Sequence, residues 1–133
     1  MGRQGFKELL VWQQAEDLAV QVYRISNASD LNKDFGLRDQ MRRSAVSVAC
    51  NLAEGDERGS DRDAVRFFYM AKGSVAELRT QIQIARDVGL LNHLLYEEVE
   101  SACVRIGKMI GALIKVRSQV APIASSHSPR TRM

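Results

Sequence analysis

Two long apolar stripes, separated by a short connection, constrain the fold of this 133-residue chain more strongly than any other feature of its sequence. In the first stripe, apolar or small residues recur at alternating intervals of three and four: Phe68, Ala71, Val75, Leu78, Ile82, Ala85 and Gly89. The second stripe has similar spacing: Leu95, Val99, Ala102, Ile106, Met109, Leu113, Val116 and Val120. This spacing keeps one face of an α-helix against a partner helix. We therefore expect two helices of about 27 residues, each roughly 40 Å long, and the connection over 88–93 is short enough to force an antiparallel hairpin.

The first half of the chain predicts two more helices. The first has an apolar face and ends near residues 26–27; the face consists of Trp12, Ala15, Leu18, Ala19, Val22 and Ile25. Trp12 begins this face, so we expect a buried structural residue and not a platform for stacking bases. A polar loop over 27–36 contains residues suited to turns and caps. The helix that follows it carries Leu37, Met41, Ala45, Val48 and Leu52 on one face.

The chain has only two prolines, Pro122 and Pro129, so no proline interrupts a helix before position 121. We expect an all-α fold, an antiparallel up-down four-helix bundle over residues 1–121. The segment 122–133 is polar and basic, and we expect it to be a disordered tail.

Composition places the chain among soluble globular proteins, with 45% hydrophobic and 26% charged residues. No apolar run approaches the ~20 residues needed to cross a membrane, and charges interrupt the N-terminal segment before it could form a signal peptide. We therefore expect a cytoplasmic protein without a membrane partner. Cys50 and Cys103 each lie within an apolar helical pattern, which predicts free buried thiols and not a disulfide.

The second helix is apolar or small almost all round, which indicates burial on more than one side. Because a helix of a four-helix bundle normally has one side in water, we expect oligomerisation to cover the surplus apolar surface. The expected interface residues are Val46, Ala49, Cys50, Ala53, Phe67 and Met70. The alternative is that a broad core stripe absorbs these residues within one subunit.

The acidic stretch NLAEGDERGS, residues 51–60, is interpreted as the end of one helix and the start of the next. Gly55 stands where the second helix should stop, and Ser60 with Asp63 resembles an N-cap and its capping-box partner. The spacing does not match a calcium loop, and His93 and His127 lie far away in sequence. We expect no metal, no cofactor and no catalytic residues, because no nucleophile–base pair or phosphate loop is present.

Basic residues are placed unevenly although the net charge is only +3. The first 103 residues hold 13 basic and 16 acidic residues, a balance of −3, and no acid follows Glu100. Basic residues at helical spacings predict a surface for a polyanion such as RNA or DNA. The expected nucleic-acid-binding residues are Arg38, Arg42, Arg43, Lys72, Arg79, Arg86, Arg105, Lys108 and Lys115. The alternative is that they form solvated or ion-paired faces, since helix dipoles alone favour part of the asymmetry.

Three segments have a recognisable sequence: residues 6–15 (FKELLVWQQA), residues 40–55 (QMRRSAVSVACNLAEG) with Arg58, and residues 70–91 (MAKGSVAELRTQIQIARDVGLL). Together they resemble the four-helix bundle family of 23S rRNA intervening-sequence proteins, which includes the accessory variability proteins of diversity-generating retroelements. The resemblance implies a bundle that assembles as a barrel-like homopentamer. It also implies an rRNA-insertion context, or a reverse transcriptase partner bound together with nucleic acid, and it does not separate these two contexts.

The sequence thus favours a non-enzymatic, homo-oligomeric scaffold that binds RNA or DNA, with a partner enzyme such as a reverse transcriptase. The alternative is a protein-only assembly or adaptor module. Binding to generic RNA that weakens steeply with salt separates the first hypothesis from the second.

Overall fold

The computed structural model of the chain describes residues 5–120, so the predicted tail over 122–133 lies outside the described residues. Four α-helices account for most of this range: α1 (Leu10–Ala28), α2 (Phe35–Asp56), α3 (Asp61–Asp87) and α4 (His93–Val120). Two short 3-10 helices, η1 (Gly5–Glu8) and η2 (Asp30–Lys33), precede α1 and α2. The described range contains no strand, and the prediction of an all-α chain with four helices is confirmed.

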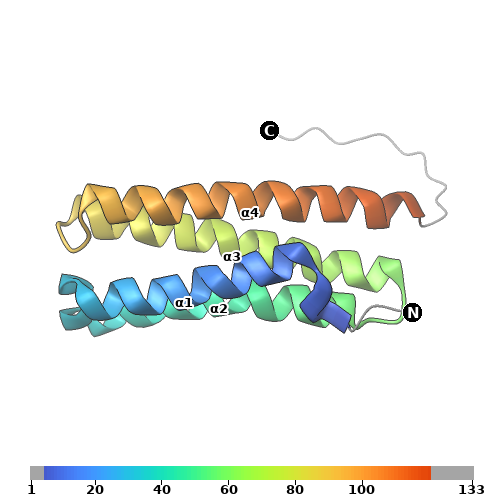
Figure 1. Cartoon of the computed structure of the whole chain (residues 1–133), viewed down its shortest axis with the longest axis horizontal. Coiled ribbons are helices and arrows are strands. Elements are labelled where there is room, and N and C mark those ends of the chain that lie inside the picture. The colour runs from blue at the N-terminus through green and yellow to red at the C-terminus, as the bar shows by residue number, and fades with distance from the viewer. Residues whose placement is uncertain (1–4, 121–133) are drawn as a thin grey trace.

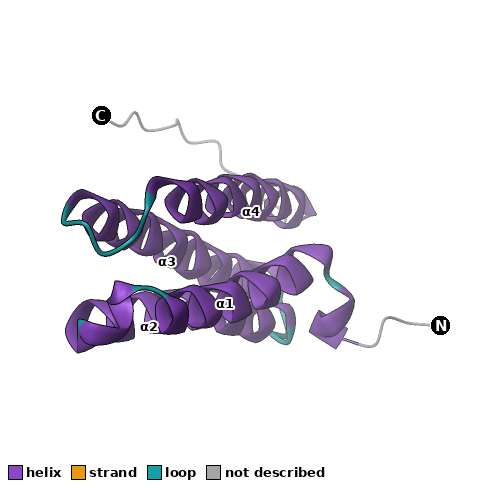
Figure 2. Cartoon of the chain, turned by 60° about the vertical axis from the view of Figure 1, so that its left-hand side comes forward, coloured by secondary structure: helices purple, strands orange, loops and turns teal. Residues whose placement is uncertain are grey.

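The four helices lie side by side along the long axis of the molecule (Figure 1). The α1–α2 and α3–α4 connections lie at one end of the molecule, and the α2–α3 connection lies at the other. α2 packs against α1 and α3, and α4 packs against α3 and α1, with the α2–α3 contact the most extensive. The second view shows the same pairing, with α3 and α4 above α1 and α2 (Figure 2). None of the described helices combines the length and apolar character needed to cross a membrane.

Most of the core is built from the apolar faces that the sequence predicts for α1, α2 and α3, although Gly89, the last residue of the predicted α3 stripe, is exposed beyond the end of α3. Leu18 and Val22 of α1, Met41 of α2, and Phe68 and Leu78 of α3 are fully buried or nearly so. η2 adds a residue that the sequence did not single out, because Leu31 in the polar loop is completely buried. Burial of these side chains removes apolar surface from water and is the main force that holds the bundle together.

The predicted stripe of α4 is partly wrong. Val99, Ala102 and Ile106 are buried as expected. Met109 is only partly buried, and Val116 is 57% exposed. The core positions that follow Ile106 are Ile110 and Ile114, which continue it in steps of four. Because α4 is apolar over a broad arc, contact with α3 decides which part of the arc faces the core, and spacing alone does not.

Trp12 is also placed differently from the prediction. It is half-buried, and Val11 takes the neighbouring core position. The Trp12 ring makes an edge-to-face contact with Phe6 of η1, with the ring centroids 5.2 Å apart. This aromatic pair holds η1 against the outer side of α1.

Gly55 does not end α2 in a left-handed cap, which corrects the sequence prediction. α2 continues to Asp56, and the only glycines with positive φ in the described range are Gly5 and Gly89. Gly55 is buried against α3, where an added Cβ would lie 2.7 Å from Cε1 of Phe68 and 2.9 Å from the carbonyl oxygen of Ala64. The glycine is therefore required by the close approach of α2 and α3. The predicted N-cap of α3 is confirmed, since the Ser60 side chain accepts a hydrogen bond from the backbone N–H of Asp63. The carboxylate of Asp63, predicted as the capping-box partner, pairs with Arg58 and Arg66.

We expect Gly55→Ala to lower the free energy of unfolding by about 1–3 kcal/mol, because the new methyl group must displace Phe68 or the backbone at Ala64. This loss outweighs the gain of up to ~1 kcal/mol that alanine has over glycine inside a helix. Urea denaturation measures the difference. The matched control is Gly73→Ala on α3, where no atom lies within 4 Å of the added Cβ and where we expect stabilisation. Equal stability of the two variants would contradict the packing role of Gly55.

Candidate nucleic-acid interface and assembly surface

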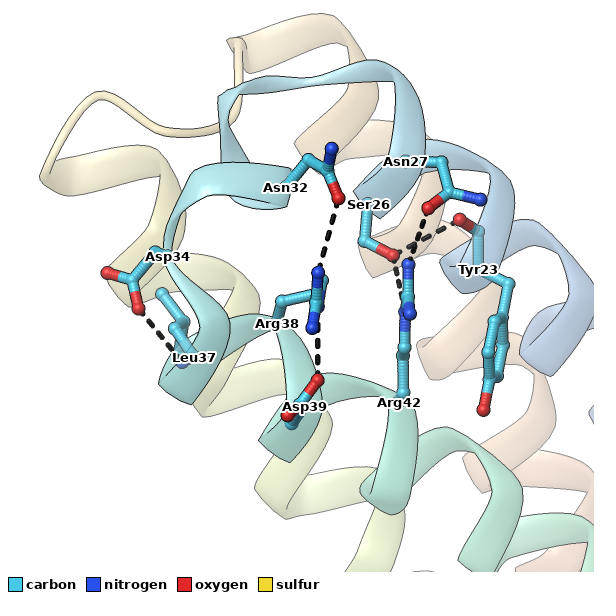
Figure 3. A network of polar contacts seen from close by, with 9 residues as sticks. All are labelled: Tyr23, Ser26, Asn27, Asn32, Asp34, Leu37, Arg38, Asp39 and Arg42. Carbon is cyan, nitrogen blue, oxygen red and sulfur yellow. Dashed lines mark hydrogen bonds and ion pairs between the residues drawn. The ribbon is translucent and has the colours of Figure 1, made fainter.

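Arg42 of α2 fastens the end of α1 to α2 (Figure 3). Its Nε donates to Oγ of Ser26 at 2.9 Å, and its Nη2 donates to Oδ1 of Asn27 at 2.8 Å. The guanidinium carbon also lies 4.5 Å from the centroid of the Tyr23 ring. Ser26 is completely buried, so its hydroxyl depends on a protein partner. The donors of Arg42 are therefore used in joining α1 to α2.

Arg38 makes a similar connection one turn earlier, between η2 and α2 (Figure 3). Its Nε pairs with Oδ1 of Asp39 at 3.0 Å, and its Nη1 donates to Oδ1 of Asn32 at 3.2 Å. Its guanidinium also lies over the exposed ring of Phe35. Arg43 differs from both, because it is exposed and makes no hydrogen bond or ion pair with any residue from 5 to 120. Of the three arginines predicted on this helix, only Arg43 is free to bind a ligand.

The candidate residues of α3 and α4 also fall into two groups, those paired within the chain and those without a partner in the described range. Arg79 forms a double hydrogen bond with Glu100 of α4, the shorter one 2.6 Å from Nη2 to Oε2, and this contact raises the pKa of Arg79. Arg86 pairs with Asp87 and lies 4.2 Å above the centroid of the Tyr96 ring. Each of these arginines therefore has a partner within the chain.

Three lysines of the predicted set have no such partner within residues 5–120: Lys72, Lys108 and Lys115. All three are exposed, and we call them the lysine face. Arg105 lies beside this face, and its Nε donates to Oε1 of Gln14 on α1 at 3.0 Å.

The lysine face extends over the outer side of the α3–α4 pair. Lys108 and Lys115 are seven residues apart on α4, so they project from the same side of the helix. Lys72 is seven residues before Arg79, which contacts Glu100 of α4, so it lies on the side of α3 that borders α4. Glu97 of α4 projects from the same side near the start of the helix, next to His93. Beyond Glu100, which is paired with Arg79, α4 carries no acid, so the part of this side that holds Lys108 and Lys115 presents only positive charge from α4.

The acidic residues at the end of α2 and the start of α3 are paired with arginines, and these pairs have a structural role. Arg58 pairs with Glu54 at 2.8 Å and with Asp63 at 3.6 Å, and its guanidinium lies over the ring of Phe67. Arg117 of α4 pairs with Asp61 and with Asp56 of the α2–α3 end. Sequence reasoning did not single out Arg117, because its partners are more than fifty residues away along the chain. Within the described range no cluster of three or more His, Cys, Asp or Glu side chains could hold a metal ion.

Four of the six predicted interface residues line one apolar groove between α1 and α2, with a volume of about 580 Å³. These four are Val46, Ala49, Cys50 and Ala53. From α1 the groove receives Trp12, Ala19, Val20 and Tyr23. We call this feature the α1–α2 groove.

The other two predicted interface residues lie on α3, outside the α1–α2 groove. Phe67 is partly buried under Arg58 and Arg66, and Met70 is 48% exposed. The α1–α2 groove therefore gathers four of the six predicted interface residues and leaves Phe67 and Met70 outside it.

The two cysteines are both free, but their surroundings differ. Cys103 is completely buried, and the loss of hydration raises the pKa of its thiol to about 12. Cys50 is exposed at the α1–α2 groove, so the prediction of a buried thiol is wrong for this residue in the single subunit.

Comparisons with known proteins agree with this architecture. A family model described as 23S rRNA-intervening sequence protein matches residues 7–112. No match was found among the curated proteins. Among solved structures, the chain is similar to a protein with unknown function from the S23 ribosomal protein family of Bacteroides thetaiotaomicron, with a TM-score of 0.73 and 20% sequence identity. The match covers 80% of this chain and 99% of that chain, and at this identity it shows the fold alone.

The different surroundings of the adjacent arginines predict different effects on stability. We expect Arg42→Gln to lower the free energy of unfolding by about 1–3 kcal/mol, because the buried hydroxyl of Ser26 loses its charged donor. We expect the control Arg43→Gln to change it by less than about 0.5 kcal/mol, since Arg43 contacts no described residue through a hydrogen bond or ion pair. Thermal and urea denaturation measure both variants. An Arg43→Gln variant as unstable as Arg42→Gln would show that Arg43 also holds the fold.

Proposed function

Because the chain belongs to the family of 23S rRNA-intervening sequence proteins, we propose that it is a non-enzymatic homo-oligomeric scaffold that binds nucleic acid. The observation that supports this most directly is the lysine face. Three exposed lysines without carboxylate partners in the described range are carried by α3 and α4. Lysine ammonium groups that are hydrated and unpaired are available to neutralise phosphates and release counterions.

The proposed binding mode is contact with the sugar-phosphate backbone. The lysine face comprises three point charges and carries no guanidinium fork aimed at a base edge. In this mode the protein contacts phosphates of any sequence, and the affinity depends strongly on salt. The remaining arginines of the predicted set contribute little, because most of them are held by partners within the chain.

The proposed assembly is a barrel-like homopentamer of up-down bundles that associate through the α1–α2 groove. The groove supports this proposal because it gathers half-exposed apolar side chains, among them Val20, Tyr23 and Val46, at one seam. Contiguous exposed apolar surface of this kind is characteristic of protein interfaces. Repeating the lysine face in each subunit would strengthen nucleic-acid binding through avidity.

The second candidate function is a protein-only adaptor, and the same groove favours it. An amphipathic helix of another protein would fit an apolar groove between two helices. The two functions differ in their response to salt and to charge removal on the lysine face.

We expect the triple variant Lys72→Gln, Lys108→Gln, Lys115→Gln to weaken binding to RNA and DNA of all sequences alike. Each lost phosphate contact should lower the magnitude of the log-affinity against log-salt slope by about 0.7 to 0.9. Fluorescence anisotropy with labelled oligonucleotides over a salt series measures the slope. The matched control replaces Lys7, Lys33 and Arg62 with Gln; these exposed cations also lack partners in the described range but lie on η1, on η2 and in the first turn of α3. Equal loss in both triple variants, or no binding by the parent, would contradict the proposal.

We expect the parent to be an oligomer at micromolar concentration and Ala49→Arg to dissociate it, because a long charged side chain would enter the α1–α2 groove. Light scattering measures the mass. The control is Ala76→Arg, at an exposed position of α3 away from this groove, which should assemble normally.

Thiol labelling at pH 8 provides a second measurement of the parent. Cys103 should stay unreactive, since its pKa of about 12 keeps the buried thiol protonated. Labelling should therefore report Cys50 and should accelerate on dilution as the groove is uncovered. A stable monomer, or labelling that is independent of concentration, would contradict assembly through this groove.

A further inference from the structure

The seam between α2 and α3 contains a polar groove that neither the fold nor the lysine face explains. Near the middle of the seam the polar groups are paired, since Oγ of Ser47 and Oγ of Ser74 lie 2.8 Å apart and Asn51 donates to Ser47. Toward the α3–α4 turn the seam opens into a groove of about 670 Å³, which we call the α2–α3 groove. Its polar lining includes Gln40, Arg43, Ser47, Glu77, Thr80 and Gln81. A volume of this size accommodates a ligand as large as a nucleotide.

The α2–α3 groove contains hydrogen-bonding groups that the chain itself does not use. Oε1 of Gln81 is the one buried side-chain oxygen or nitrogen in the described range that has no hydrogen-bond partner. Buried polar groups are nearly always paired, so an unpaired one calls for a cause. The oxygen is covered by neighbouring atoms in the free protein, so a rotation about the terminal torsion of Gln81 is needed to bring it to a ligand.

Two charged side chains of the same groove are also unpaired. The guanidinium of Arg43 and the carboxylate of Glu77 line the groove, but neither forms an ion pair or hydrogen bond with a residue in the range 5–120. Arg42, the immediate neighbour of Arg43, has all its contacts within the fold. The groove therefore offers an exposed cation from α2 and an exposed carboxylate from α3, and the amide of Gln81 lies one helical turn from that carboxylate.

We propose that the α2–α3 groove binds a guanine nucleotide. Glu77 and Gln81 accept hydrogen bonds from the N1–H and amino group of the base, and Arg43 pairs with its phosphate. Guanine fits because its Watson–Crick edge presents two adjacent N–H donor groups to two acceptors, whereas adenine and cytosine present only an amino group there. Ile84, which is 47% exposed in the same groove, provides an apolar wall for the flat face of the base.

The nucleotide has two sources, a free guanosine monophosphate or an unpaired guanine within a single-stranded RNA. The RNA-borne form rests on the proposed function, and the free form does not. A dipeptide also carries an anion and N–H donors, but it offers no planar edge with two adjacent donors to the two acceptors.

NMR titration of the full chain tests the proposal, with the methyl signals of Ile84 as the reporter in the groove. Guanosine monophosphate should shift these signals at roughly ten-fold lower concentration than the adenosine, cytidine and uridine monophosphates. Glu77→Gln should abolish this preference, because it removes the carboxylate acceptor. Arg43→Gln should weaken all four nucleotides about equally and leave guanosine, which lacks the phosphate, unaffected. Asp17→Asn on α1 and Arg62→Gln in the first turn of α3 remove one charge each from exposed positions outside both grooves and should behave as the parent.

The outcomes separate this proposal from the proposed function. Absence of an Ile84 shift with guanosine monophosphate, an equal shift with all four nucleotides, or an equal shift with glycylglycine would overturn it. Retention of the guanine preference in Glu77→Gln would overturn it as well. Salt-dependent binding of guanine-free RNA without any nucleotide effect in the groove would leave the lysine-face function standing and remove the groove proposal. If the protein binds guanosine monophosphate but no RNA, the groove proposal would stand and the lysine-face function would be removed.

Discussion

The close packing of α2 on α3 at Gly55 is the contact on which the rest of the arrangement depends. Phe68 fills the space that a side chain at this glycine would occupy, and it is completely buried. The guanidinium of Arg117 lies 5.5 Å from the centroid of the Phe68 ring, and the same residue pairs with Asp56 and Asp61. One end of the bundle therefore joins α2, α3 and α4 through adjoining contacts. Because this end fixes α4 against α3, it also fixes where the lysines of α4 lie relative to Lys72.

Arginine and lysine have different roles in this chain, and their chemistry explains the division. The planar guanidinium offers several donors in fixed directions and stacks on aromatic rings, so it can connect two elements at once. Arg42 and Arg79 do this between α1 and α2 and between α3 and α4. The lysine ammonium is a strongly hydrated point charge, and the exposed lysines of α3 and α4 remain without partners in the described range.

The periodic features of the fold could be predicted from sequence because each depends on neighbouring residues. The stripes of α1 to α3 and the Ser60 cap are of this kind. Gly55 could not be assigned, since a glycine near a helix end is compatible with a cap as well as with close packing, and only Phe68 decides between them. The candidate site could not be predicted fully for the same reason, because its contacts join residues that are distant in sequence. A sequence shows where cations recur, but Glu100 is 21 residues from Arg79, so pairing across the bundle is not visible in the spacing.

In the proposed function, the position of the two surfaces on the bundle would link assembly to nucleic-acid binding. The α1–α2 groove belongs to one pair of helices and the lysine face to the other pair, and these pairs lie on opposite sides of the molecule (Figure 1). Subunits that associate through the groove would therefore keep their lysine faces outward and exposed. The charges of neighbouring subunits would then act on one polyanion, and each added contact would benefit from the high local concentration set by the first. If the lysine face had instead been on α1 or α2, assembly would bury unpaired ammonium groups, which is strongly unfavourable.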